Sequence, residues 1–173
     1  MAEDLFDLYR TLGGKLDRPA LRPGAWDLSL DGVLIELDEE LHFNRHRETT
    51  LRRPWAAALP WTAPYLDMCR AREVECLRAA RWGQRWTSQS SVRMFGGGGQ
   101  PGDISSDAGA PRWKQRALYD AVKDAIAAQD EDTKVARLSV YDEVSGRLLG
   151  DVLEDRAPLD LDELLAVLAS RTS

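Results

Sequence analysis

The stretch Ala25-Trp-Asp-Leu-Ser-Leu-Asp-Gly-Val-Leu-Ile-Glu-Leu-Asp-Glu-Glu-Leu-His42 predicts a β-hairpin. Asp31-Gly32 separates two runs in which apolar and polar residues alternate, which is a strong short-range hairpin signal. With these two residues as the turn, the expected cross-strand pairs are Leu30 with Val33, Leu28 with Ile35 and Asp27 with Glu36. This register decides which side chains share a face of the sheet.

The hairpin is expected to have one apolar and one acidic face, because side chains alternate across a strand. The apolar face would carry Trp26, Leu28, Leu30, Val33, Ile35 and Leu37. The opposite face would carry Asp27, Ser29, Leu34, Glu36 and Asp38. Three carboxylates over a dry apolar layer favour a site for a hard divalent cation such as Mg²⁺. The alternative is the solvent-exposed side of an antiparallel sheet, where acids are common.

Size and composition fit one soluble domain. The chain has 173 residues, of which 43% are hydrophobic and 30% charged. It lacks a run of about 18 apolar residues and an apolar signal core, so we expect a cytoplasmic protein without a membrane span. Cys69 and Cys76 lie seven residues apart in an expected helix, a spacing that favours free thiols over a disulfide or a zinc site.

Charge is distributed unevenly along the chain. The net charge is −6, yet residues 44–116 contain 13 Lys and Arg against 6 Asp and Glu. A basic middle within an acidic chain suggests a polyanionic partner, because cationic side chains release counterions from phosphates. Arginines that merely cover solvated helix faces explain the same count equally well.

The order of the expected elements indicates a mixed α/β fold. Apolar spacing predicts helices over 3–12, 65–81, 111–128 and 160–170, and alternation predicts a strand over 135–142 with a possible return strand over 147–153. Residues 95–111 read as a glycine-rich loop that lacks the lysine and hydroxyl residue of a phosphate-binding P-loop.

Two further residues are candidates for chemistry. His42 shares the parity of the acidic face if the strand continues straight, which would let it carry a proton or contact a phosphate. Lys114 lies in the first turn of the helix expected to begin at Pro111, where free amides attract phosphate. The alternatives are a structural histidine and a surface lysine whose stem covers apolar side chains.

The segment Glu36-Leu-Asp-Glu-Glu-Leu-His42-Phe43 resembles the E-[VI]-D-G-x-x-H segment of small bacterial endonuclease-like domains. Those domains are related to very-short-patch repair endonucleases, in the PD-(D/E)XK nuclease superfamily. The likeness includes the upstream Asp27 and the short helix before the hairpin, and it covers roughly residues 3–53. The longer block from Glu36 to Arg47 also resembles actinobacterial proteins of unknown function.

This resemblance implies a restriction-endonuclease-like core in a single domain, residues 1–173. Its mixed sheet would be led by the β-hairpin, with helices on both sides and a helical insertion and loop at 54–110. It also implies a nuclease that hydrolyses phosphodiester bonds in DNA with Mg²⁺ or Mn²⁺. The implied metal ligands are Asp27, Glu36 and Asp38.

The resemblance also suggests further site residues. Asp38 stands where the superfamily has its lysine, so Lys114 is the candidate for a lysine supplied from a helix, and His42 would assist with charge or proton transfer. The side chains expected to contact nucleic acid are Arg45, Arg47, Arg52, Arg53 and Arg112. The second hypothesis is a protein that binds protein or nucleic acid on a degenerate nuclease-like scaffold. A homodimer or larger assembly stays open.

Overall fold

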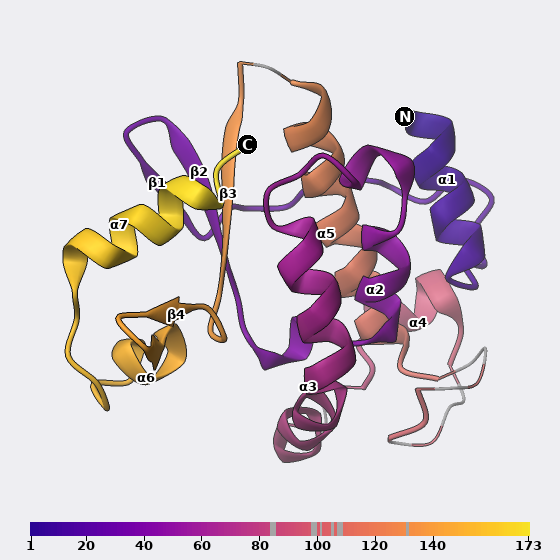
Figure 1. Ribbon diagram of the computed structural model, residues 1–173. Helices are drawn as coiled ribbons and strands as arrows, with labels where there is room; N and C mark the ends of the chain where they lie inside the picture. The colour runs from indigo at the N-terminus through magenta and orange to yellow at the C-terminus, as the bar shows by residue number, and fades with distance from the viewer. Residues whose placement is uncertain (84–85, 98–99, 101, 105, 107–108, 131) are drawn as a thin grey trace.

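The sheet is small and mixed. A computed structural model describes residues 1–83, 86–97, 100, 102–104, 106, 109–130 and 132–173. Within these residues the main sheet has the order β1 (Leu28–Leu30), β2 (Val33–Asp38) and β3 (Lys134–Ser139) (Figure 1). β1 runs antiparallel to β2, whereas β3 runs parallel to it. A parallel neighbour requires a long crossover, which the helices between β2 and β3 provide.

The hairpin register predicted from Asp31-Gly32 is confirmed over β1. Leu28 pairs with Ile35, and Leu30 pairs with Val33. Asp31 and Gly32 have φ values of 48° and 81°, the positive values that a type I′ turn needs. The ladder ends at Leu28, so the backbone of Asp27 does not pair with Glu36. Instead, Oδ2 of Asp27 accepts a hydrogen bond of 2.9 Å from the Leu37 amide.

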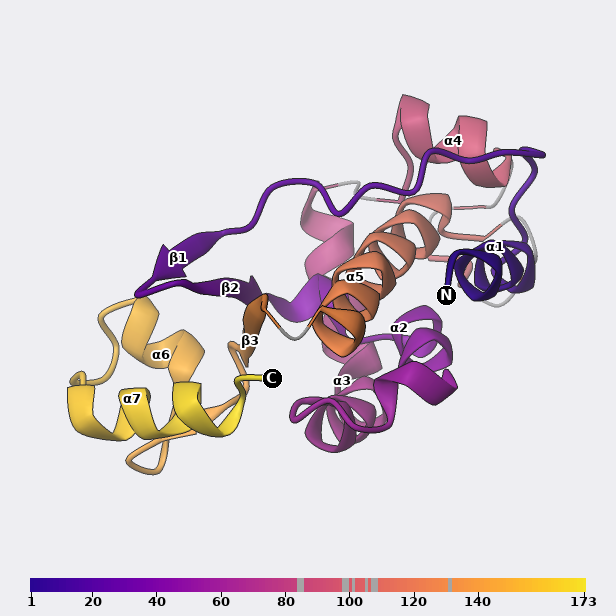
Figure 2. The same ribbon diagram turned by 90° about the horizontal axis from the view of Figure 1, so that it is seen from above.

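The central helix is α5 (Pro111–Gln129), which lies against one face of the sheet (Figure 2). It packs against the N-terminal helix and against several helices of the crossover. The remaining elements on this side are α1 (Ala2–Thr11), η1 (Glu40–His42), α2 (Arg45–Leu51), η2 (Pro54–Ala56), α3 (Thr62–Gly83) and α4 (Gln89–Phe95). The residues of 54–110 that pack with Phe43, Leu51 and Val135 belong to the same core as the sheet.

The other face of the sheet is covered by the C-terminal segment, which contains β4 (Glu143–Val144), β5 (Arg147–Leu148), α6 (Leu149–Leu153) and α7 (Leu161–Ser170). Ile35 and Leu138 pack there against α6 and α7 (Figure 2). The sheet therefore has helices on both sides. The return strand expected over 147–153 is corrected, because the chain enters α6 after Leu148 and buries Leu149 and Val152 at helical spacing.

The apolar face of the hairpin is only partly as expected. Ile35 is buried, but Leu28 and Leu30 on the edge strand are 61% and 47% exposed. Trp26 packs with the core cluster on the opposite face, under the Lys123 ammonium. It precedes the ladder, so strand alternation does not fix the direction of its side chain.

The longer helices predicted from periodicity are confirmed as α1, α3, α5 and α7, and β3 confirms the predicted strand. The short helices α2 and α4 were not predicted. Their N-caps are Asn44 and Ser88, whose side chains accept backbone amides of the first turn. Positions 98–99, 101, 105 and 107–108 of the glycine-rich loop lie outside the described residues. No helix in the described ranges combines the length and apolar composition needed to cross a bilayer.

The positive φ of Gly32 gives a test of the hairpin. Gly32→Val should lower the free energy of unfolding by about 1–2 kcal/mol, because a β-branched residue is strained in the left-handed region. Gly32→Asn should cost much less, since asparagine tolerates that region. Urea unfolding of both variants measures the difference. Equal losses in the two variants would contradict this account of the turn.

Candidate functional site

The candidate site lies where β2 faces α5. Glu36 and Asp38 project from the same face of β2 and are 4% and 1% exposed. α5 presents Asp120, Lys123 and Asp124 toward them, at positions i, i+3 and i+4 of one helix face. Two acids on a strand are thus matched by a charged stripe on the helix.

Arg137 of β3 lies at the centre of this charge cluster and is fully buried. Its Nη1 is 2.6 Å from Asp38 Oδ2, and its Nε is 3.0 Å from Asp124 Oδ1. Its Nη2 is 3.3 Å from Asp120 Oδ1. One guanidinium therefore joins the strand acid to two acids of α5, using the planar fork that only arginine offers.

A second buried guanidinium, Arg47 of α2, completes the cluster. It lies 2.6 Å from Asp124 Oδ2, and Trp61 Nε1 donates to the same carboxylate at 3.2 Å. The cluster contains three carboxylates, from Asp38, Asp120 and Asp124, and the two guanidiniums. One further positive charge makes it neutral.

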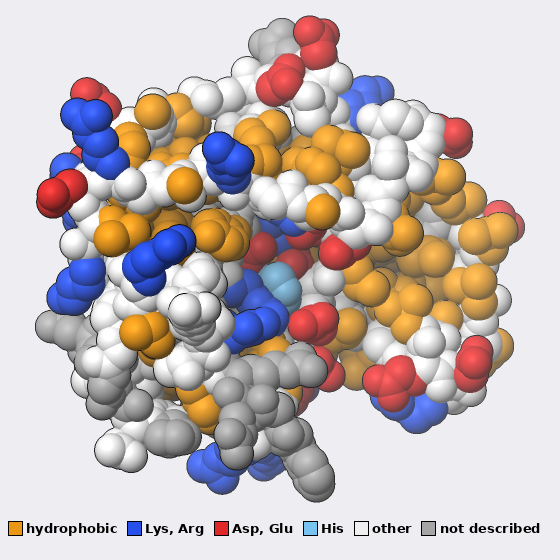
Figure 3. Space-filling view, turned by 180° about the vertical axis from the view of Figure 1, so that it is seen from behind, with side chains coloured by type: hydrophobic (Ala, Val, Ile, Leu, Met, Phe, Trp, Pro, Cys, Tyr) orange, Lys and Arg blue, Asp and Glu red, His pale blue; other side chains and the backbone are white. Residues whose placement is uncertain are grey.

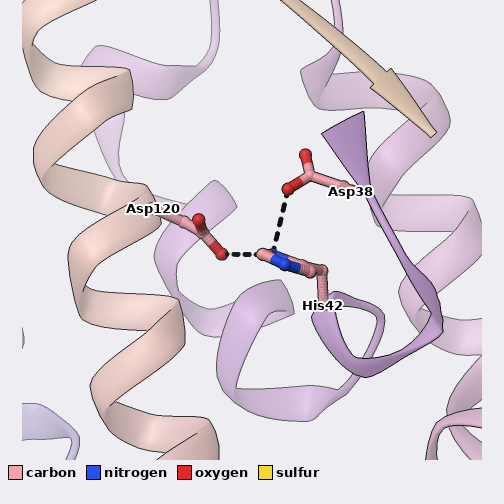
Figure 4. Close-up of side chains that lie close together, drawn as sticks. All are labelled: Asp38, His42 and Asp120. Atoms are coloured by element: carbon pink, nitrogen blue, oxygen red, sulfur yellow. Dashed lines mark hydrogen bonds and ion pairs between the residues drawn. The ribbon is translucent and has the colours of Figure 1, made fainter. Parts of the chain in front are cut away.

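His42 supplies that charge. The strand ends at Asp38, and the 3₁₀ turn η1 directs His42 back toward it. The ring Nδ1 is 3.0 Å from Asp38 Oδ1 and 2.9 Å from Asp120 Oδ2 (Figure 4). Burial alone would lower the pKa of His42, but the two carboxylates outweigh it and raise the pKa to about 9. The imidazole is therefore protonated at neutral pH.

The pKa values of the two acids that contact His42 are lowered, whereas that of His42 is raised. Burial alone would raise the pKa of Asp38, but Arg137 and His42 outweigh burial and hold that pKa well below its ordinary value. The pKa of Asp120 is also lowered, since His42 and Arg137 outweigh its burial. These pKa directions keep Asp38 and Asp120 ionised beside the protonated ring of His42 at neutral pH.

Glu36 and Lys123 form a separate ion pair beside the cluster. Lys123 Nζ lies 2.5 Å from Glu36 Oε1 and donates to the Ala25 carbonyl at 2.7 Å. It also lies 5.0 Å from the centre of the Trp26 ring. Burial raises the pKa of Glu36, Lys123 and Arg137 oppose the increase, and the nearby Asp27 adds to it.

This ion pair opens into a cleft of about 390 Å³. Besides Glu36 and Lys123, its described lining includes His42, Asp120, Arg112 and Arg116. Figure 3 shows a hollow in which a histidine ring lies between basic and acidic side chains. The cleft therefore combines four cationic groups with two carboxylates and is open to solvent.

The structure brings together some of the site residues expected from the sequence. Glu36, His42 and Arg112 line the cleft, and Asp38 lies directly beneath it. Asp27 is exposed at the hairpin end, close enough for its charge to raise the pKa of Glu36.

Two expected assignments are corrected. Lys114 lies nine residues before Lys123, about 13 Å along the helix axis, and it lines a different cavity. Arg47 is fully buried against Asp124, so its guanidinium does not face a phosphate. The other arginines of 45–53 are accessible but engaged: Arg45 pairs with Glu73, Arg52 with Glu48, and Arg53 donates to Thr11.

Sequence reasoning missed the charged residues of α5 and β3. Asp120, Lys123 and Asp124 adjoin the apolar stripe of their helix, and Arg137 interrupts an otherwise apolar strand. Charged residues in segments expected to be buried are a signal, because a buried charge requires a partner. Reading those positions together would have suggested a buried ion network.

Among the described residues, one group of side chains could hold a metal ion, and it consists of Asp38, His42 and Asp120. Their donor atoms all lie within 4.8 Å of one another. A metal ion there must displace a proton from a nitrogen whose pKa is about 9. It would also sit beside the positive charge of Arg137, which is already paired with both carboxylates. This cluster is therefore better suited to hold a proton than a divalent cation.

Comparison with known proteins gives a family but no named relative. The model of a family of unknown function, DUF7255, matches residues 7–155. The chain belongs to this family, and the match includes every residue of the cluster and of the cleft. No curated protein and no solved structure matched the chain.

The raised pKa of His42 predicts how stability depends on pH. A proton bound more tightly in the folded state stabilises it fully below the ordinary pKa near 6.5, and this stabilisation is lost as pH rises through about 9. The loss should be on the order of 3 kcal/mol. Urea unfolding between pH 6.5 and 9.5 measures it.

His42→Gln should abolish most of this decline, while His46→Gln should keep it, because the pKa of His46 is lowered to about 4. If wild type and His42→Gln lose stability equally over this range, His42 is not the group responsible.

Proposed function

We propose that this member of DUF7255 is a nuclease that hydrolyses phosphodiester bonds in DNA, with the cleft of Glu36 and Lys123 as its active site. The observation that carries the proposal is the contact of 2.5 Å between these two side chains, at the edge of an open cleft lined by arginines. An acid and a lysine side by side are what the PD-(D/E)XK resemblance implies. Here the lysine comes from α5, in place of the lysine two positions after the glutamate.

The chain order around the site supports the same proposal. An antiparallel hairpin carries Asp27 and Glu36, a helical crossover follows, and the next strand is parallel to the second strand of the hairpin. We propose that this arrangement is a restriction-endonuclease-like core. The helix that packs on the sheet, α5, supplies both Lys123 and Arg112.

The divalent cation that the resemblance implies fits only part of the expected ligand set. Both oxygens of Asp38 are engaged, one by His42 and one by Arg137, so this residue does not fit. Asp27 and Glu36 fit a hard cation, which takes one or two carboxylates and keeps several waters. Burial is the main cause of the raised pKa of Glu36, and the charge of Asp27 adds to it, a repulsion that a cation would relieve. A bound Mg²⁺ or Mn²⁺ would supply an acidic water and neutralise developing negative charge.

The chain's own residues have distinct roles in this proposal. Lys123 places a positive charge beside Glu36, where it stabilises negative charge on the scissile phosphate. Arg112 and Arg116 line the same cleft and hold neighbouring phosphates of the strand.

His42 is suited to act as an acid in this cleft. Hydrolysis joins a water oxygen to phosphorus and releases an alcohol whose oxygen needs a proton. The His42 imidazolium lines the cleft, and Asp38 and Asp120 hold its Nδ1. With a pKa near 9 it carries a proton at neutral pH.

Substitution of the ion pair tests the catalytic proposal. Lys123→Met and Glu36→Gln should each reduce cleavage of plasmid DNA in Mg²⁺ or Mn²⁺ by about a hundredfold or more, the loss typical of removing one transition-state contact. Lys134→Met removes an exposed ammonium outside the cleft and should retain activity. Circular dichroism of each variant confirms folding. Equal cleavage by all four proteins, or none by any, contradicts the proposal.

The arginines give a separate test on binding. Replacing Arg112 and Arg116 together by Gln should weaken binding to a short duplex and lower the slope of log K against log salt concentration by about 2. Fluorescence anisotropy over a range of salt concentrations measures this slope. An unchanged slope would place the duplex elsewhere on the protein.

A second candidate function is nucleic-acid binding without cleavage. This candidate is favoured by the residue that replaces the superfamily's lysine. That residue is Asp38, and it is paired with Arg137 in the buried cluster. Salt-dependent binding through Arg112 and Arg116 without any cleavage in Mg²⁺ or Mn²⁺ would support this candidate over the nuclease.

A further inference from the structure

The C-terminal helix α7 is apolar on both of its sides. Its inner side carries Leu164, Val167 and Leu168, which pack against the core cluster of the sheet. None of its ten residues is buried, however, and Leu161 and Leu165 are 57% and 45% exposed. The two ribbon views show α7 at the outer edge of the molecule (Figure 1 and Figure 2).

The charges of α7 are confined to its first turn. Asp162 and Glu163 lie there, and residues 164–170, which follow, are Leu, Ala, Val and Ser. A helix on the surface of a protein normally presents charged or polar side chains to solvent, whereas a helix that is apolar on all sides is buried. Beyond its first turn, the outward side of α7 therefore has the composition of an interface.

An outward stripe of α7 is complementary to its own inverse. The exposed residues Leu161, Leu165 and Ala169 follow one another at intervals of four, so they lie along one side of the helix. If a second copy is placed antiparallel about a two-fold axis at Leu165, then Leu161 of each helix faces Ala169 of the other. Large side chains meet small ones at both ends of the pair, and the two Leu165 side chains meet at the axis.

The same antiparallel arrangement keeps like charges apart. Asp162 and Glu163 of one helix lie at the opposite end of the pair from those of the other, and they approach the end of the second helix, where Arg171 adds positive charge. Arg171 already pairs with Asp142, so this attraction is a minor contribution. A parallel pair would instead place the carboxylates of both helices side by side, which is unfavourable.

We propose that the outward face of α7 binds a second copy of this chain, with the two α7 helices antiparallel across a two-fold axis near Leu165. The occupant is a second copy because the stripe matches its own inverse both in side-chain size and in the position of its charges. The stripe residues do not line the cleft of Glu36 and Lys123, so this pairing is independent of the nuclease proposed above.

The size of this face sets the expected affinity. A helix of ten residues is about 15 Å long, and Leu159, which is 58% exposed just before α7, extends the apolar surface at its start. An interface built mainly from one such helix per copy is small. We therefore expect a weak dimer with a Kd of about 10–100 µM.

A cysteine placed at the axis gives the sharpest test, because a residue on a two-fold axis meets its own copy. Cys69 and Cys76 are buried, so Leu165→Cys adds an exposed thiol to a chain whose own thiols are not accessible. Under mild oxidation with diamide, Leu165→Cys should form a disulfide-linked dimer at least about tenfold faster than Val74→Cys, since thiols held together react at a high effective concentration. Val74 is a matched control because it is 59% exposed on α3. Leu161→Cys should cross-link as slowly as this control, because Leu161 faces an alanine.

Sedimentation velocity over a range of concentrations measures the dimer without an added thiol. Wild type should dimerise with the expected Kd, and Leu165→Glu should raise the Kd at least about tenfold, because it places two like charges at the centre of the interface. Val74→Glu should keep the wild-type Kd, and circular dichroism confirms that both variants fold.

Three results would overturn the proposal. One is a dimer that Leu165→Glu does not weaken, and another is equal cross-linking of Leu165→Cys and Val74→Cys. The third is a wild type that stays monomeric up to about 1 mM, which would leave this face of α7 to a different protein.

Discussion

The buried guanidinium of Arg137 is the interaction on which the rest of the structure depends. Its nitrogens lie 2.6–3.3 Å from carboxylate oxygens of one residue of β2 and two residues of α5. Burying such charges carries a large desolvation cost that only close pairing offsets, and removing one partner typically costs about 3–5 kcal/mol. The orientation of α5 over the sheet is therefore set by charge pairing as well as by apolar packing.

The same network divides the charges of the site into two groups. Asp38, Asp120 and Asp124 are committed to Arg137, Arg47 and His42, and this group is neutral when His42 is protonated. Glu36 and Lys123 lie outside it, at the wall of an open cleft. One histidine joins the two groups, because its Nδ1 belongs to the network while its ring lines the cleft. Any group that reacts in the cleft therefore lies directly above the buried ion network.

Short sequence patterns predicted those parts of the fold that depend only on residues close together in the chain. The Asp31-Gly32 turn fixed the hairpin register, and apolar spacing located α5 and β3. The choice between Lys114 and Lys123 could not be made in this way, since it depends on which face of α5 meets the sheet. That face is set by the parallel pairing of β2 with β3, which are about a hundred residues apart. The position of His42 likewise depends on the turn η1, which strand parity does not anticipate.

Titration of the His42 ring by NMR is the sharpest check on the ion network, because the pKa of the ring reports the two carboxylates that enclose the imidazole. We expect an imidazolium that persists to about pH 9. A pKa at or below the ordinary value near 6.5 would show that Asp38 and Asp120 do not hold this ring, and it would contradict the ion network described above.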